Sequence, residues 1–180
     1  MSRPSRRDEL LAAALSLLVE WGYEGMAISM LAEEVGVTKA AVTYHFPSKE
    51  DLLAALADPL LNALDEVVPA AGEVPDWPDG VRALVERYLD ILLANQDLAV
   101  WLEGDRAVLV HAAVGERLRA NHDRMRAALV GGSTETRGQI AASIALGALW
   151  RPVRKIGAED VERHRDLLVA SAMAPLDAWR

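Results

Sequence analysis

Apolar residues recur along most of the chain at intervals of three and four positions, which is the spacing of amphipathic helices. Leu and Ala dominate these positions, and no segment of strand length alternates between apolar and polar residues. The first periodic segment has its apolar face at Leu11, Leu15, Leu18 and Val19. Ser5 followed by Asp8 is a capping-box pattern, so we expect a helix that starts there and ends near Gly22. The pattern predicts an all-α protein.

Two short helices and one long helix are expected next. The short ones cover about residues 29–35 and 39–46; Gly36 ends the first and Thr38 caps the second. Pro47 stops the second short helix. Ser48 and Asp51 repeat the capping-box pattern at the start of the long helix, which extends to about residue 67. We expect Pro59 to kink or interrupt it.

A proline-rich segment, residues 69–78, then predicts a loop. The apolar pattern resumes after it and predicts five more helices, at about 79–95, 98–110, 115–130, 134–156 and 158–173, with Pro152 bending the fourth of these. We expect two domains, 1–46 and 47–180. The first is a three-helix domain, and the second is a larger helical domain.

The two short helices are separated by only three residues, 36–38, a turn length typical of a helix-turn-helix. Ala32 is small where the helices would cross, and the inner faces carry Leu31, Val35, Val37 and Val42. The second helix then leaves Lys39, Ala40, Thr43 and Tyr44 available to a DNA major groove. The short pattern alone is also compatible with an ordinary αα-hairpin.

From Trp21 to Leu53 the chain resembles the N-terminal DNA-binding region of the TetR family of transcriptional regulators. The matching positions are Gly22-Tyr23, Leu31-Ala32, Gly36-Val37-Thr38, Tyr44-His45-Phe46, Ser48-Lys49-Glu50 and Leu52. The resemblance implies a dimeric repressor that binds a palindromic operator. It also implies that the C-terminal helices bind a small-molecule effector, which moves the two DNA-reading domains apart and releases the DNA.

The resemblance also implies roles for matching residues. Lys39, Ala40 and Ala41 would face base edges, Thr38 and His45 would lie near phosphates, and Lys49 would contact a phosphate from the start of the long helix. The sequence departs from the family pattern at Ala27 and Thr43, where threonine and tyrosine are usual. Thr43 can still donate to phosphate, and Tyr44 would take over part of that contact.

The charge of the chain restricts how it could bind DNA. The net charge is −8, and residues 1–51 hold five Lys and Arg against eight acidic residues. A basic surface must therefore come from arrangement rather than abundance. Arg3, Arg6 and Arg7 can form a flexible arm that follows phosphates or a minor groove, or they are a solvated tail.

The C-terminal two thirds give weaker signals. Ligand pockets are mostly apolar with few polar groups, so Tyr88, Trp101 and Trp150, with Arg106, His111 and Asn121 as polar partners, are candidate effector-binding residues. The alternative is that the aromatic residues are ordinary core or surface side chains.

Six of the eight residues in 141–148 are small: Ala141, Ala142, Ser143, Ala145, Gly147 and Ala148. The last helix carries Leu167, Leu168, Ser171 and Ala172 at helical spacing. Small side chains let helices approach closely, which favours a homodimer formed through the last two helices. The alternative is a core within one chain.

Several function classes have little support. There are no cysteines, and no apolar run approaches the ~20 residues of a membrane span, so we expect a cytoplasmic protein without disulfides or membrane contact. Neither common catalytic motifs nor metal-ligand spacings occur, and we expect no enzyme activity, cofactor or metal. The competing hypothesis is a helical protein-interaction module or an unrecognised helical enzyme.

Overall fold

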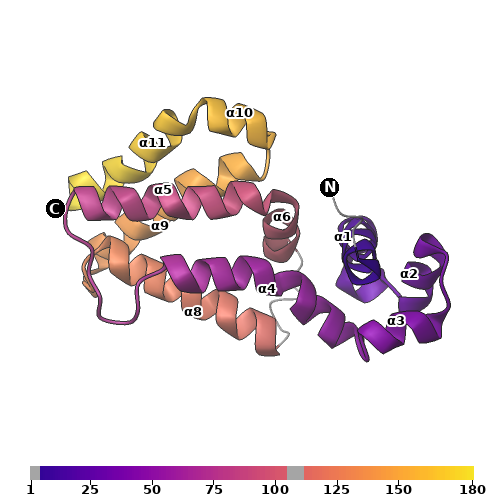
Figure 1. The fold of residues 1–180 in the computed structure, drawn as a ribbon. Helices are drawn as coiled ribbons and strands as arrows, with labels where there is room; N and C mark the ends of the chain where they lie inside the picture. The colour runs from indigo at the N-terminus through magenta and orange to yellow at the C-terminus, as the bar shows by residue number, and fades with distance from the viewer. Residues whose placement is uncertain (1–4, 105–111) are drawn as a thin grey trace. The chain divides into compact units, whose positions relative to one another are not determined.

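The computed structural model describes residues 5–104 and 112–180, and every regular element in these ranges is an α-helix (Figure 1). The helices are α1 (Arg6–Gly25), α2 (Ile28–Val35), α3 (Lys39–His45), α4 (Lys49–Val67), α5 (Asp79–Ala94), α6 (Gln96–Gly104), α8 (Ala112–Leu129), α9 (Thr136–Val153), α10 (Ala158–Arg163) and α11 (Arg165–Trp179). The prediction of an all-α fold is confirmed. Within the described ranges, no helix combines the length and apolarity that crossing a bilayer requires.

Contacts along the chain define two compact units. The first comprises Met1–Pro59 and Asp97–Glu116, and the second comprises Leu60–Gln96 and Arg117–Arg180. In the first unit α1 packs against α2 and α2 packs against α3; we call these three helices the head. The expected division into domains 1–46 and 47–180 stays a prediction.

The start of α1 forms the predicted capping box. The Asp8 amide donates to the Ser5 hydroxyl over 3.2 Å, and the Ser5 amide donates to the Asp8 carboxylate over the same distance. The hydrogen bonds from Ser5 lower the pKa of Asp8 below its usual value. The expected end near Gly22 coincides with a break in the helix: Gly22 has a non-helical backbone (φ 70°, ψ 172°), and a short helical segment follows it to Gly25. Glycine tolerates that positive φ without the strain that a Cβ would add.

The second predicted capping box, before α4, is confirmed as well. The Asp51 amide donates to the Ser48 hydroxyl, and the Ser48 amide donates to the Asp51 carboxylate, both over 3.0 Å. Pro59 does not interrupt α4, which continues to Val67. A proline removes one helical hydrogen bond, and the burial of residues on both sides of it, Ala57 and Leu60 among them, offsets that loss.

Several later boundaries also differ from the prediction. Helix α9 ends one residue after Pro152 rather than near residue 156, and the expected helix 158–173 is two helices, broken at His164 (φ −117°, ψ 28°). Helix α11 then passes through Pro175 to Trp179. Of the helix expected at 98–110, the part after Gly104 lies outside the described residues.

The core of the second unit lies where α5, α9 and α11 pack together (Figure 1). Helices α9 and α11 pack tightly at Gly138, where an added Cβ would lie 3.0 Å from the indole ring of Trp179. The ring therefore occupies the space that any larger side chain would need. Between α5 and α9, the indole N–H of Trp150 donates to the Tyr88 hydroxyl over 3.0 Å.

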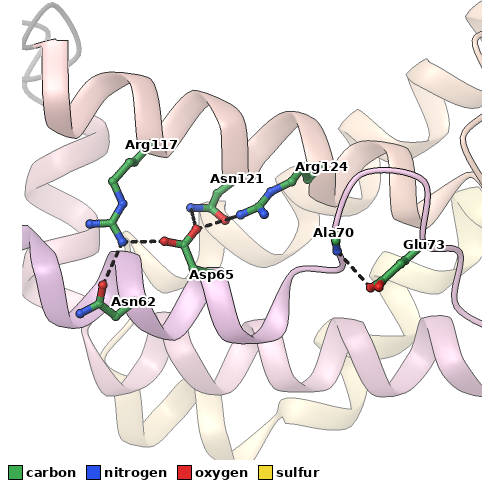
Figure 2. A network of polar contacts seen from close by, with 7 residues as sticks. All are labelled: Asn62, Asp65, Ala70, Glu73, Arg117, Asn121 and Arg124. Carbon is green, nitrogen blue, oxygen red and sulfur yellow. Dashed lines mark hydrogen bonds and ion pairs between the residues drawn. The ribbon is translucent and has the colours of Figure 1, made fainter.

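A polar network joins the C-terminal part of α4 to α8 (Figure 2). The Asp65 carboxylate accepts from Arg117 (2.5 Å), Asn121 (3.0 Å) and Arg124 (2.8 Å), and Arg117 also donates to Asn62 (2.9 Å). Asn121 is buried, with 3% of its surface exposed, and its carbonyl accepts from Arg124. The hydrogen bond from Arg117 is the main cause of the lowered pKa of Asp65.

Candidate nucleic-acid interface

The turn between α2 and α3 depends on Gly36, which adopts the left-handed conformation (φ 67°, ψ 39°). Its amide donates to the Glu33 carbonyl (3.1 Å), and the next amide, of Val37, donates to the Ala32 carbonyl (2.8 Å). These two bonds close the C-terminal end of α2. No atom lies within 4 Å of a Cβ built on Gly36, so backbone conformation rather than space requires glycine here.

Helix α3 begins directly after this turn. The Thr38 hydroxyl accepts from the Ala41 amide over 3.2 Å, as expected for a helix cap. Ala27, by contrast, makes no side-chain cap for α2, because alanine has no hydrogen-bond acceptor in its side chain. On the inner side Val42 is fully buried and the following Phe46 is 2% exposed, while Leu31 and Ala32 are buried on α2. Of the expected inner-face residues, Leu31 and Val42 are thus buried, whereas Val35 and Val37 are only partly buried.

Four exposed residues of α3 form its outer face. At 100° per residue, Lys39, Thr43, Ala40 and Tyr44 follow one another in this order over an arc of about 140°. All four are exposed, and the Tyr44 side chain most of all, at 84%. Ala41 and His45 are partly exposed and lie beyond the Tyr44 end of this arc, by about 60° and about 100°. The structure thus brings Lys39, Ala40, Thr43 and Tyr44 to one accessible face and leaves Ala41 and His45 beside it.

The Thr43 side chain is already engaged within the helix. Its hydroxyl donates to the Lys39 carbonyl one turn earlier, over 2.8 Å. The sequence predicts that this hydroxyl donates to phosphate, but in this structure it donates to the backbone. Tyr44 has no such bond among the contacts described, and its ring meets His45 edge-on with centroids 5.4 Å apart.

Lys49, the predicted phosphate contact, binds Tyr23 at the end of α1. Its ammonium group donates to the Tyr23 carbonyl and lies 4.4 Å from the centroid of the Tyr23 ring. The Tyr23 hydroxyl approaches the Glu50 carboxylate at 3.4 Å. Burial, followed by the negative charge of Glu50, raises the pKa of Tyr23 to about 12. Lys49 therefore also joins the head to α4, a role that local sequence patterns do not predict.

The expected flexible arm is wrong for two of its three arginines. Arg6 and Arg7 are the first residues of α1, where Arg6 forms an ion pair with Glu9 (2.6 Å) and Arg7 lies 5.3 Å from the centroid of the Phe46 ring. The capping box at Ser5 starts the helix before these residues, which gives them helical rather than extended backbone. Arg3 lies outside the described residues.

The structure describes four of the six candidate effector-binding residues and brings two of them, Tyr88 and Trp150, into contact. Tyr88 and Trp150 are brought together by their hydrogen bond, but Asn121 uses its amide group in the network around Asp65. Trp101 is buried in the first unit, and its indole N–H has no partner among the residues described. Arg106 and His111 lie outside the described residues. An effector site built from these residues stays a prediction.

An exposed groove of about 850 Å³ runs along α9 and reaches α11. Its lining includes Ile140, Ser143, Ile144, Gly147 and Ser171, and the two isoleucines are more than half exposed. The small residues of 141–148 divide between two faces. Ala141, Ala142 and Ala145 are buried within the chain, whereas Ser143, Gly147 and Ala148 line the groove. Arg151, Thr136 and Gln139 also line the groove, and no local pattern in the sequence marks them.

The first unit thus carries a helix-turn-helix with an exposed second helix, which is the fold of proteins that place a helix in the DNA major groove. Residues 10–56 match the family described as bacterial regulatory proteins, tetR family. Residues 10–56 are therefore a TetR-family DNA-binding region.

Two relatives extend this similarity beyond the head. The transcriptional repressor AcnR of Corynebacterium diphtheriae is 41% identical over 127 residues, which are 64% of this chain and 65% of that protein. The nicotine-responsive repressor HdnoR of Paenarthrobacter nicotinovorans is 29% identical over 112 residues, 56% of each chain. The chain thus spans between half and two thirds of these relatives.

The similarity in fold to a solved structure extends over nearly the whole chain. The crystal structure of SCO3833, a member of the TetR transcriptional regulator family from Streptomyces coelicolor A3, superposes with a TM-score of 0.73. The match covers 98% of this chain and 92% of that one at 19% identity, so it concerns the fold alone.

Proposed function

We propose that this protein is a DNA-binding transcriptional regulator that acts as a repressor and is released from a palindromic operator by a small-molecule effector. The observation that carries the proposal is the outer face of α3, where Lys39, Ala40, Thr43 and Tyr44 are exposed together on the second helix of a helix-turn-helix. A groove-binding helix needs such a face. The names of both relatives described above, which are repressors, support the direction of regulation.

The acting form is a homodimer. One seven-residue helix contacts too few base pairs to select a site alone, and two copies related by a twofold axis would read the two halves of a palindrome. The groove along α9 and α11 supports this proposal, because Ile140 and Ile144 expose apolar surface there that a second copy would cover.

The effector is a small molecule that binds the DNA-free conformation more tightly than the DNA-bound one, since only unequal affinity can shift the equilibrium. The nicotine-responsive relative supports regulation of this kind. The family evidence favours a regulator over an enzyme, and we propose that the chain has no catalytic activity.

The test is binding of the full chain to random duplex DNA at low salt, followed by selection of preferred sequences. We expect retention that falls steeply as salt rises, because phosphate contacts dominate nonspecific affinity. We also expect the selected sequences to be inverted repeats. The centres of their half-sites should be separated by one helical turn of DNA, about 34–36 Å, or by a multiple of that distance. A chain that binds no duplex at low salt would favour the helical interaction module instead.

A further inference from the structure

Given the proposed function, the chemistry of the outer face of α3 restricts which base pairs it can read. Thr43 and Ala40 occupy the middle of the arc, with Lys39 on one flank and Tyr44 on the other. A helix lying in the major groove presents the middle of its outward face to base edges and its flanks to the two walls of the groove. The two central residues therefore face the base edges at the floor of the groove directly, whereas Lys39 can reach them only with its long side chain.

Neither central residue offers a hydrogen-bond donor to the groove. Ala40 ends in a methyl group, and the Thr43 hydroxyl donates its proton to the Lys39 carbonyl over 2.8 Å. With the hydroxyl turned back along the helix, the exposed remainder of the Thr43 side chain is its Cγ2 methyl group. Ala41, about 60° beyond Tyr44, has a third methyl group and is partly exposed.

We infer that α3 reads thymine C5-methyl groups through the methyl groups of Ala40 and Thr43, so that each operator half-site carries required A·T pairs opposite the middle of the helix. Among the four bases, only thymine presents an apolar group in the major groove, and alanine and threonine methyls are suited to contact it. A guanine or cytosine at the same position would leave its polar edge facing apolar atoms, which is costly when water is excluded.

The experiment replaces thymine by deoxyuridine, which pairs identically with adenine and lacks only the C5-methyl group. A preferred duplex is first selected with the full chain from a randomised pool, and each thymine is then replaced singly. We expect one or two positions in each half-site at which the replacement weakens binding about fourfold, the loss expected for one buried methyl group. Replacement at the remaining positions should leave affinity unchanged.

Two variants of Thr43 identify the protein side of the contact. Thr43→Ser keeps the hydroxyl and removes the methyl group, and it should abolish the effect of deoxyuridine at one of these positions. Thr43→Val keeps the methyl group and removes the hydroxyl, and it should retain the effect. Circular dichroism of both variants checks that the helices are intact.

The outcomes separate this inference from the function it rests on. Sequence-specific binding that is indifferent to deoxyuridine everywhere, or a selected half-site without required A·T pairs, overturns the inference and leaves the regulator intact. A deoxyuridine effect that persists in Thr43→Ser and disappears in Thr43→Val also overturns it, because the hydroxyl would then be the reading group. Failure to bind any duplex overturns both.

Discussion

The contact between Lys49 and Tyr23 illustrates how one side chain can serve two purposes. The ammonium group has three donors and uses one on the Tyr23 carbonyl, while its charge lies over the Tyr23 ring. The side chain is partly exposed, so its remaining donors can reach a phosphate. Its position at the first residue of α4 would then be fixed before DNA arrives.

We predict that Lys49→Ala weakens binding to all duplex sequences to a similar extent. It should also reduce the slope of log affinity against log salt by about 0.9 for each protomer on the DNA, because one phosphate contact is lost. Titrations of two unrelated duplexes at several salt concentrations measure this. The matched control is Lys155→Ala, an exposed lysine after α9. An unchanged slope would restrict Lys49 to its contact with Tyr23.

Lys39 lies on a flank of the outer face of α3 and is exposed. Lysine can reach the acceptor pair of guanine, and a good contact of this kind discriminates between bases by about 1–3 kcal/mol. We predict that Lys39→Ala reduces the preference for the best duplex over the second-best by about this amount. Competition binding with both duplexes is the measurement, and equal losses on both would assign Lys39 to phosphate.

At the residue scale, the sequence predicts what depends on near neighbours. The capping boxes at Ser5 and Ser48 and the left-handed Gly36 follow from rules that span three or four positions, and all are confirmed. The Lys49–Tyr23 contact joins residues 26 positions apart and therefore cannot be found in this way. The Thr43 hydroxyl can donate either to the backbone or to solvent. Only the side-chain conformation in the structure shows that it donates to the Lys39 carbonyl.

The pairing of α4 with α8 depends on Asp65, which accepts hydrogen bonds from three residues of α8. We predict that Asp65→Ala lowers the free energy of unfolding by about 2 kcal/mol, because the buried Asn121 amide loses its acceptor. Asp65→Asn keeps one acceptor oxygen and should cost about 1 kcal/mol. Denaturant unfolding measures both variants.

The matched control for this prediction is Asp123→Ala, which removes an exposed carboxylate that pairs with Arg126 on the same helix. Its expected cost is below about 0.5 kcal/mol, the range of such surface pairs. Equal losses in Asp65→Ala and Asp123→Ala would mean that the α4–α8 network contributes no more than a surface ion pair.

The same network predicts a dependence on pH. The pKa of Asp65 is lowered in the folded chain, mainly by the hydrogen bond from Arg117. Its stabilising contribution is therefore complete above the unfolded pKa of about 3.9 and is lost as pH falls through the lower, folded value. The Asp65 carboxylate is 40% exposed, so solvent screening keeps this contribution to about 1 kcal/mol or less.

We predict that the difference in unfolding free energy between the natural chain and Asp65→Asn is constant from pH 7 to about pH 5 and shrinks below about pH 4. Urea unfolding of both chains across this range tests it. A difference that stays constant down to pH 3 would show that the carboxylate charge does not contribute.

Among the helices, the positions of prolines do not predict where a helix ends. Pro59 and Pro175 lie within continuous helices, whereas α9 ends directly after Pro152. The cost of a proline is local, but burial of the neighbouring residues decides whether the helix continues, and burial is a property of the folded chain. The break at His164 could not be predicted in this way, because no glycine or proline lies at that position.

At the scale of the whole molecule, the groove along α9 and α11 is the surface on which the proposed dimer depends. We predict that Ile144→Glu converts the dimer to monomers, because two buried carboxylates would face each other across a twofold axis. Sedimentation analysis measures the mass. Val74→Glu is the control, since Val74 is equally exposed and lies outside the groove lining. An unchanged dimer in Ile144→Glu would place the interface elsewhere.

The head is the part of the molecule that the sequence predicts best, since its short helices, turn and caps are all local. The second unit is predicted less well. The small residues of 141–148 suggest close packing, but only the structure shows that Ala141, Ala142 and Ala145 pack within the chain while Ser143 and Gly147 face outward. The candidate effector-binding residues lie far apart in the sequence. Whether they form one site depends on how the helices pack, and local sequence patterns do not predict that packing.

The exposed isoleucines of α9 have a consequence for how the regulator would respond to its own abundance. If two chains must associate before an operator is bound, the concentration of the binding species rises with the square of the chain concentration below the dimer dissociation constant. Halving the amount of protein would then reduce the binding species about fourfold. The apolar groove would thus set a threshold of cellular abundance below which the operator stays empty, even without an effector.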